Sequence, residues 1–93
     1  MDSIVDTIEL ILNKDIVARD AANLNFKLNN YKSTIYFQKI NDSNIIINAK
    51  SLIGLLQGHF RQGEAIKVFI FDMKDISELD KIKETLNEIG GRK

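Results

Sequence analysis

The chain has 93 residues, of which 44% are hydrophobic and 28% are charged. Thirteen basic residues balance thirteen acidic ones, so the charge gives no reason to expect nucleic acid or an anionic membrane surface as a partner. The sequence contains no cysteine, which excludes disulfides and thiol chemistry. We expect one globular domain over residues 1–93, because a chain of this length buries one modest core.

The beginning of the chain favours a cytoplasmic protein. Residues 1–6 contain no basic stretch followed by an apolar run, so they do not resemble a signal peptide. No apolar run approaches the roughly 20 residues that span a bilayer, so we expect no membrane insertion. The abundance of isoleucine, asparagine and lysine is typical of an AT-rich bacterial genome.

A strand and a helix are expected first along the chain. Residues 3–12 predict a strand, because their apolar side chains favour one parity. Residues 17–30 predict an amphipathic helix, and Phe26 lies off its apolar stripe. The apolar positions of the strand are Ile4, Ile8 and Leu10, and the helix stripe is Ala18, Ala21, Leu24, Leu28 and Tyr31.

The middle of the chain predicts a hairpin and then a short helix. Residues 33–40 and 45–49 are rich in β-branched and aromatic residues. Residues 41–44, Asn-Asp-Ser-Asn, supply turn chemistry between them, in a loop longer than the tightest hairpin loops. A short helix is expected to begin at Ser51, and Gly58 and Gly63 bracket its expected end.

The last third of the chain predicts a strand, a helix and a tail. Residues 65–71 are the most hydrophobic strand candidate, and residues 75–89 have the pattern of an amphipathic helix. Gly90 is expected to stop this helix, and Gly90-Gly91 is expected to be a flexible tail. The helix stripe is Ile76, Leu79, Ile82, Leu86 and Ile89.

The expected order is β-α-β-β-α-β-α, an α+β fold in which helices on one face of an antiparallel sheet bury the apolar stripes. Residues 15–21 read Asp-Ile-Val-Ala-Arg-Asp-Ala, and residues 50–55 read Lys-Ser-Leu-Ile-Gly-Leu. These segments resemble the active-site segment Gly-Ile-His-Ala-Arg-Pro-Ala and the regulatory segment Lys-Ser-Ile-Met-Gly-Val of the HPr phosphocarriers of the sugar phosphotransferase system. The resemblance covers nearly the whole chain. It implies an open-faced sandwich with a four-stranded antiparallel sheet and three helices on one face.

Residues 15–21 differ from the family segment at the position of the residue that carries the phosphate. The resemblance places Val17 where the family has its phosphorylated histidine, Asp20 where it has proline and Asp15 where it has glycine. Valine has no nucleophilic nitrogen, so we expect no catalytic residue and no histidine phosphotransfer. A helix N-terminus and the Arg19 guanidinium favour an anion or a partner contact, whereas Asp15 and Asp20 bring negative charge to the same turn. A solvated surface arginine is the plainer interpretation of Arg19.

No other residue supplies clear chemistry. His59 is the only histidine, and it is expected near the end of the short second helix, where a surface role is more common than phosphorylation. A zinc site would need further histidine or cysteine ligands, so we expect no metal. No motif indicates a cofactor. We therefore expect that the chain is not an enzyme.

Ser51 is the expected regulatory residue. In the family that the chain resembles, this serine is phosphorylated by a dedicated kinase, and the phosphoserine form binds a transcriptional regulator. Negative charge at a helix N-terminus is favourable, and Lys50 adds a nearby cation that we assign, with Arg19, to an anion or partner contact. The plainer interpretation is that Ser51 is only an N-cap.

A partner-binding surface is expected on the first two helices. A short helix cannot bury all of its apolar residues, and Leu55 is the expected core residue of the second helix. The remaining apolar residues are expected to form an exposed patch of the kind that often marks protein contacts, although single exposed apolar residues are common. The patch residues are Phe26, Leu52, Ile53 and Leu56.

Three functions remain open. The first is a regulatory protein-binding module of the catabolite-control type, whose partners are phosphotransferase-system enzymes, a serine kinase or a transcriptional regulator. The second is a phosphocarrier that uses another residue. The third is an interaction domain or homodimer subunit that keeps the fold but has no link to sugar transport. The absent nucleophile and the retained Ser51 segment favour the first.

Overall fold

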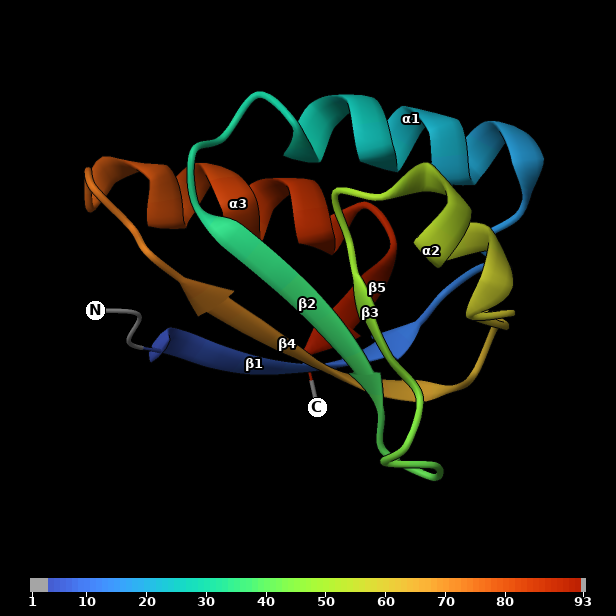
Figure 1. Cartoon of the computed structure of the whole chain (residues 1–93). Coiled ribbons are helices and arrows are strands. Elements are labelled where there is room, and N and C mark those ends of the chain that lie inside the picture. Colours follow the sequence, from blue (N-terminus) through green and yellow to red (C-terminus); the bar gives the residue numbers. More distant parts are fainter. Residues whose placement is uncertain (1–3, 93) are drawn as a thin grey trace.

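The computed structural model describes residues 4–92. Within this range one sheet has the strand order β3-β2-β4-β1-β5, and every neighbouring pair is antiparallel. The three helices lie on one face of the sheet (Figure 1). The elements are β1 (Ile4–Leu12), α1 (Ala18–Leu28), β2 (Thr34–Lys39), β3 (Ile46–Asn48), α2 (Leu52–Gln57), β4 (Ala65–Phe71), α3 (Ser77–Asn87) and β5 (Gly90–Arg92). The predicted α+β class and element order are confirmed from β1 to α3.

The core lies between the helices and the sheet. Side chains alternate along a strand, so Ile66, Val68 and Ile70 of β4 are fully buried while Lys67 and Phe69 lie on the opposite face. The buried stripe of α1 is Ala21, Leu24 and Leu28, and that of α3 is Ile82, Thr85 and Leu86. The prediction included Ala18 in the buried stripe of the first helix. In the structure Ala18 is the first residue of α1 and is exposed. Ser3 and the side chain of Ile4, which the prediction assigned to the first strand, lie outside what the structure describes.

The fifth strand corrects the prediction of a four-stranded sheet and of a flexible tail at Gly90-Gly91. β5 pairs with β1 over Leu10–Leu12. A Cβ atom on Gly90 would lie 2.6 Å from the carbonyl oxygen of Ile11, so glycine permits this close approach of the two backbones.

α3 begins later than predicted. Its first residue is Ser77, and Ile76, which the prediction placed in the buried stripe, is 70% exposed. The Asp75 carboxylate accepts hydrogen bonds from the backbone N–H of Ser77 over 3.0 Å and from its hydroxyl over 2.8 Å. The backbone hydrogen bond, followed by the side-chain one, holds the pKa of the Asp75 carboxyl below its ordinary value. Asp75 thus satisfies a donor at the start of α3, where the prediction had placed the helix itself.

Candidate functional site

The start of α1 has no side-chain cap. Its N-cap residue is Val17, which has extended backbone angles (φ −126°, ψ 158°). The Val17 side chain is 55% exposed, and Arg19 is exposed as well. Ala18 follows with a φ of +25°, in a region that residues with a Cβ atom rarely adopt. A solvent-facing alkyl group therefore stands where the unpaired N–H groups of α1 begin.

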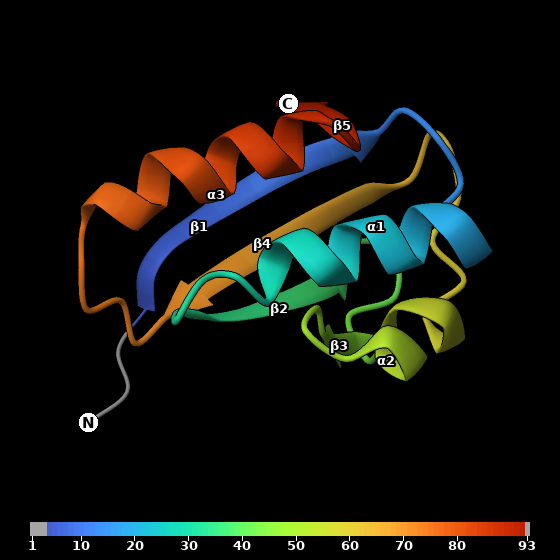
Figure 2. The ribbon, with the colours of Figure 1, turned by 90° about the horizontal axis from the view of Figure 1, so that it is seen from above.

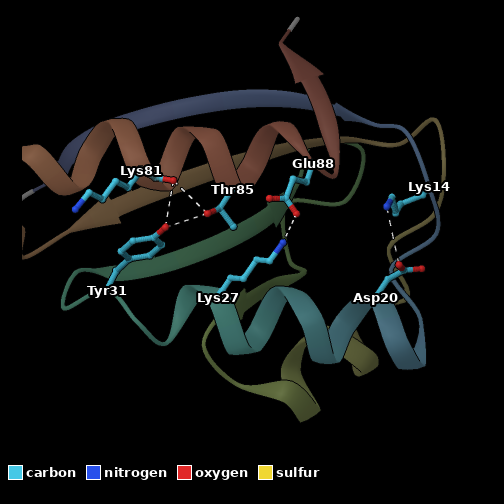
Figure 3. A network of polar contacts seen from close by, with 7 residues as sticks. All are labelled: Lys14, Asp20, Lys27, Tyr31, Lys81, Thr85 and Glu88. Atoms are coloured by element: carbon cyan, nitrogen blue, oxygen red, sulfur yellow. Dashed lines mark hydrogen bonds and ion pairs between the residues drawn. The ribbon is translucent and has the colours of Figure 1, made fainter.

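The two aspartates of this turn have different contacts. The backbone N–H of Gln62 donates to Asp15 Oδ1 over 2.7 Å, so Asp15 ties the loop before α1 to the loop before β4. Asp20 lies in the first turn of α1, and its carboxylate is 3.9 Å from the Lys14 ammonium (Figure 3). Only Asp20 is therefore placed to complement the dipole of α1 from within the helix.

His59 lies in a loop that runs beside the loop preceding α1. The backbone N–H of Ile16 donates to the carbonyl of Phe60, the next residue after His59, over 2.9 Å. His59 is exposed and has a φ of +49°, and its carbonyl accepts a hydrogen bond from the Lys39 ammonium over 3.0 Å. Sequence reasoning missed this arrangement, because it depends on contacts between two loops that are distant in the chain.

α2 begins with a side-chain cap. The Ser51 hydroxyl oxygen accepts a hydrogen bond from the backbone N–H of Gly54 over 3.1 Å, which confirms the predicted N-cap. Leu55 is fully buried, as expected, and its N–H donates to the Ser51 carbonyl over 3.0 Å. Ser51 itself remains partly exposed.

Lys50 makes a contact that its sequence position did not indicate. Its ammonium donates to the carbonyl of Tyr31 just after α1, and the Asn29 side-chain amide donates to the Lys50 carbonyl over 3.2 Å. Burial lowers the pKa of the Lys50 ammonium, and the nearby Glu78 carboxylate opposes this effect. Lys50 therefore links the start of α2 to the end of α1, and its ammonium is already engaged by a protein carbonyl.

The α1/α2 patch, defined as Phe26, Leu52, Ile53 and Leu56, is exposed on two neighbouring helices. α1 and α2 lie side by side (Figure 2). Phe26 is 73% exposed and Ile53 is 67% exposed, while Leu52 and Leu56 are each close to 40%. Arg19 precedes Phe26 by seven residues, so both lie on one face of α1. That this surface binds a partner stays a prediction.

Polar contacts join α1 to α3 (Figure 3). The Lys27 ammonium lies 2.5 Å from Glu88 Oε1, and the Tyr31 hydroxyl lies 3.0 Å from the Thr85 hydroxyl. A small pocket between the helices is lined by Lys14, Asp20, Asn23, Leu24, Lys27, Glu88 and Ile89. Both lysines of this pocket are paired with carboxylates, so the pocket presents no unbalanced charge to a ligand.

Within residues 4–92, no group of three or more His, Asp or Glu side chains is placed to hold a metal ion. No helix in the same range is long and apolar enough to cross a membrane.

A family model described as the PTS HPr component phosphorylation site matches residues 4–88. The chain belongs to the HPr family of the phosphotransferase system. HPr-C-His from Thermoanaerobacter tengcongensis is similar in structure, with a TM-score of 0.64 and 23% identity over 90% of this chain and 88% of that one. HPr from Bacillus anthracis str. Ames gives a TM-score of 0.66 and 19% identity over 90% and 95% of the two chains.

These two structures establish that the chain shares the HPr fold, and at such low identity they establish nothing finer. No curated protein sequence matches the chain. The HPr-like open-faced sandwich that the sequence predicted is confirmed, with β5 as an addition.

Proposed function

We propose that this HPr-family chain is a cytoplasmic regulatory module that binds proteins of the phosphotransferase or catabolite-control systems and does not carry phosphate on a histidine. The observation that carries the proposal is the exposed Val17 at the N-cap of α1. The family's phosphorylated histidine stands at the corresponding position of the segment that residues 15–21 resemble. An isopropyl group can neither attack phosphorus nor hold a labile phosphoryl group.

The binding surface of the proposed module is the α1/α2 patch together with Arg19. Apolar side chains exposed on adjacent helices favour contact with a protein, and the Arg19 guanidinium has no ion-pair partner among the described residues. An unpaired arginine beside an apolar surface suits a partner that offers a carboxylate next to an apolar side chain.

Phosphorylation of Ser51 is the proposed switch for this surface. The Ser51 hydroxyl already accepts from the Gly54 N–H, and phosphate oxygens are stronger acceptors at the same helix end. The added charge would stand directly before Leu52 and Ile53, two of the patch residues. It would therefore change the electrostatic character of the binding surface without a change of fold.

The first experiment tests the loss of phosphotransfer. The chain is incubated with phosphoenolpyruvate and the first enzyme of the phosphotransferase system, with an HPr that carries the histidine as positive control. We expect no acid-labile label on this chain. A label that disappears in the His59→Ala variant would contradict the proposal and identify a phosphocarrier that uses His59. That second function is favoured by the loop contact between Ile16 and Phe60.

The second experiment tests the switch. The chain is incubated with ATP and an HPr-serine kinase and then analysed by mass spectrometry, with Ser51→Ala as the matched control. We expect one added phosphate in the parent chain and none in the variant. An unmodified Ser51 would remove the switch from the proposal and leave the binding surface.

The third experiment tests the partner class. Affinity capture with the parent chain is compared with capture by a Phe26→Ser, Ile53→Ser double variant. We expect a phosphotransferase-system or catabolite-control protein to be captured by the parent chain only. Capture of neither kind of protein would favour an interaction domain that has no link to sugar transport.

A further inference from the structure

The face of the sheet opposite the helices carries an aromatic cluster. Tyr36 of β2 and Phe69 and Phe71 of β4 alternate with buried core residues, so they point away from the helices. The rings of Tyr36 and Phe71 meet edge to face with centroids 5.7 Å apart, and Phe69 stacks on Phe71 at 6.3 Å. All three side chains remain partly exposed. The α1/α2 patch lies on the other side of the molecule, so this cluster is independent of the proposed function.

Opposite charges lie side by side on the same face. Glu9 of β1 is the cross-strand partner of Lys67 of β4. In the next rows on either side of this pair, Thr7 is opposite Phe69 and Ile11 is opposite Ala65. Ile11 is 37% exposed. The centre of the face is therefore one acidic and one basic group, with Gln38 beside Lys67 in β2 and with Phe69 and Ile11 in the adjacent rows.

We propose that this open face binds a second copy of the chain, face to face, in a symmetric dimer. A two-fold axis that runs parallel to the strands between β1 and β4 places Lys67 of each copy over Glu9 of the other. The same axis places Phe69 over Thr7 and Ile11 over Ala65. The face is therefore complementary in charge to itself, and a chain of zero net charge does not repel its copy.

The charge pattern also argues against a nucleic acid on this face. Aromatic side chains on a sheet can stack on bases, but such platforms combine them with a positively charged groove. Here Lys67 is matched by Glu9 in the adjacent strand. A surface with balanced charges and exposed aromatic rings suits a protein surface of the same kind.

The size of the face predicts a weak dimer. In this arrangement β1 and β4 of one copy cover β4 and β1 of the other, and two strands about 4.8 Å apart and about 25 Å long give a footprint of roughly 240 Å². Stable complexes bury about 800 Å² of accessible surface on each partner. We therefore expect association that depends on concentration, in the micromolar to millimolar range.

The test is sedimentation velocity of the full chain from micromolar to millimolar concentration, with folding checked by circular dichroism. The parent chain is expected to shift toward twice the monomer mass, and the Phe69→Ser variant is expected to stay monomeric. Phe26→Ser is the matched control, because it removes an exposed phenylalanine from the helix side, and it is expected to dimerise like the parent.

A charge exchange makes the test independent of the aromatic cluster. Lys67→Glu is expected to weaken association at least about tenfold, because it sets like charges against each other across the axis. The Glu9→Lys, Lys67→Glu double variant is expected to restore it. A parent chain that stays monomeric at millimolar concentration overturns the proposal, even if Phe69 responds to another protein or to a single-stranded oligonucleotide. A dimer that Phe26→Ser abolishes and Phe69→Ser leaves intact overturns it as well.

Discussion

The N-termini of α1 and α2 need the same hydrogen-bond acceptors, but their N-cap side chains differ. Each helix begins with N–H groups that lack an acceptor inside the helix. At α2 the Ser51 hydroxyl accepts from the Gly54 N–H, whereas at α1 Val17 provides no acceptor and exposes its methyl groups to solvent. α1 nevertheless forms, because Ala21, Leu24 and Leu28 are buried against the sheet.

The difference between the two helix starts indicates that the fold of α1 and the chemistry at its N-terminus depend on different residues. Packing of the apolar stripe is enough to position α1, so the N-cap residue is free to change without loss of the helix. The function that depends on that one side chain can then disappear while the family fold remains. The following predictions test this separation, from the largest expected effect to the smallest.

The largest effect is expected from Val17→His. It places a nucleophilic ring nitrogen at an exposed helix start next to Arg19, so the chain should gain acid-labile label from phosphoenolpyruvate and the first enzyme of the system. The label should be about tenfold or more above that of the Val17→Gln control, whose amide cannot carry phosphate. An unlabelled Val17→His variant would show that Asp20 or the positive φ of Ala18 also blocks transfer.

The next effect concerns the two sides of α2. Leu55→Ala removes a fully buried side chain and should lower the free energy of unfolding by about 2–5 kcal/mol. Ile53→Ala removes an exposed side chain of the same helix and should change it by less than about 0.5 kcal/mol. Urea unfolding measures both variants. Equal losses would mean that the α1/α2 patch contributes to the core.

A smaller effect is expected from the cap itself. Ser51→Ala removes the acceptor of the Gly54 N–H and should lower the free energy of unfolding by about 1 kcal/mol. Val17→Ala removes no acceptor and should change it by less than about 0.5 kcal/mol. The two variants are compared by urea unfolding under one set of conditions. A loss at Val17 that equals the loss at Ser51 would contradict the contrast between the two helix starts.

The smallest effect extends the comparison to α3, where Asp75 accepts from Ser77. Because these hydrogen bonds lower the pKa of the folded carboxyl, Asp75 contributes stability above the unfolded carboxyl pKa of about 4. That contribution is lost as the pH falls through the folded pKa. The melting temperature of Asp75→Ala should therefore lie slightly below that of the parent at neutral pH and converge with it in strong acid. A gap that widens in acid would exclude this role.

Local sequence patterns were sufficient to predict most of the helices and strands. High hydrophobicity predicted β4, the three-to-four spacing predicted the buried stripe of α1, and serine chemistry predicted the N-cap at Ser51. Each of these depends on neighbours within a few positions of the chain. The limited burial that a short helix can provide led to the prediction of Leu55 as the core residue of α2, which is confirmed.

Contacts between distant segments could not be predicted in this way. Gly90–Arg92 has no alternation of its own and becomes a strand only because β1 offers a pairing edge. The contact between Lys50 and Tyr31 and that between Asp15 and Gln62 depend on how the loops meet after folding. The aromatic cluster lay within the predicted strands, and the parity of Tyr36, Phe69 and Phe71 could have located it.

β5 also determines how the end of β1 behaves toward other chains. An unpaired strand edge is a template for aggregation, and β1 ends in the apolar sequence Leu10-Ile11-Leu12. β5 occupies the outer hydrogen-bonding side of these residues, while β3 at the opposite margin of the sheet is only three residues long. Proteolytic clipping just before Gly90 would uncover the apolar end of β1, and insoluble, fibril-like material would be the expected product of such a clipped chain.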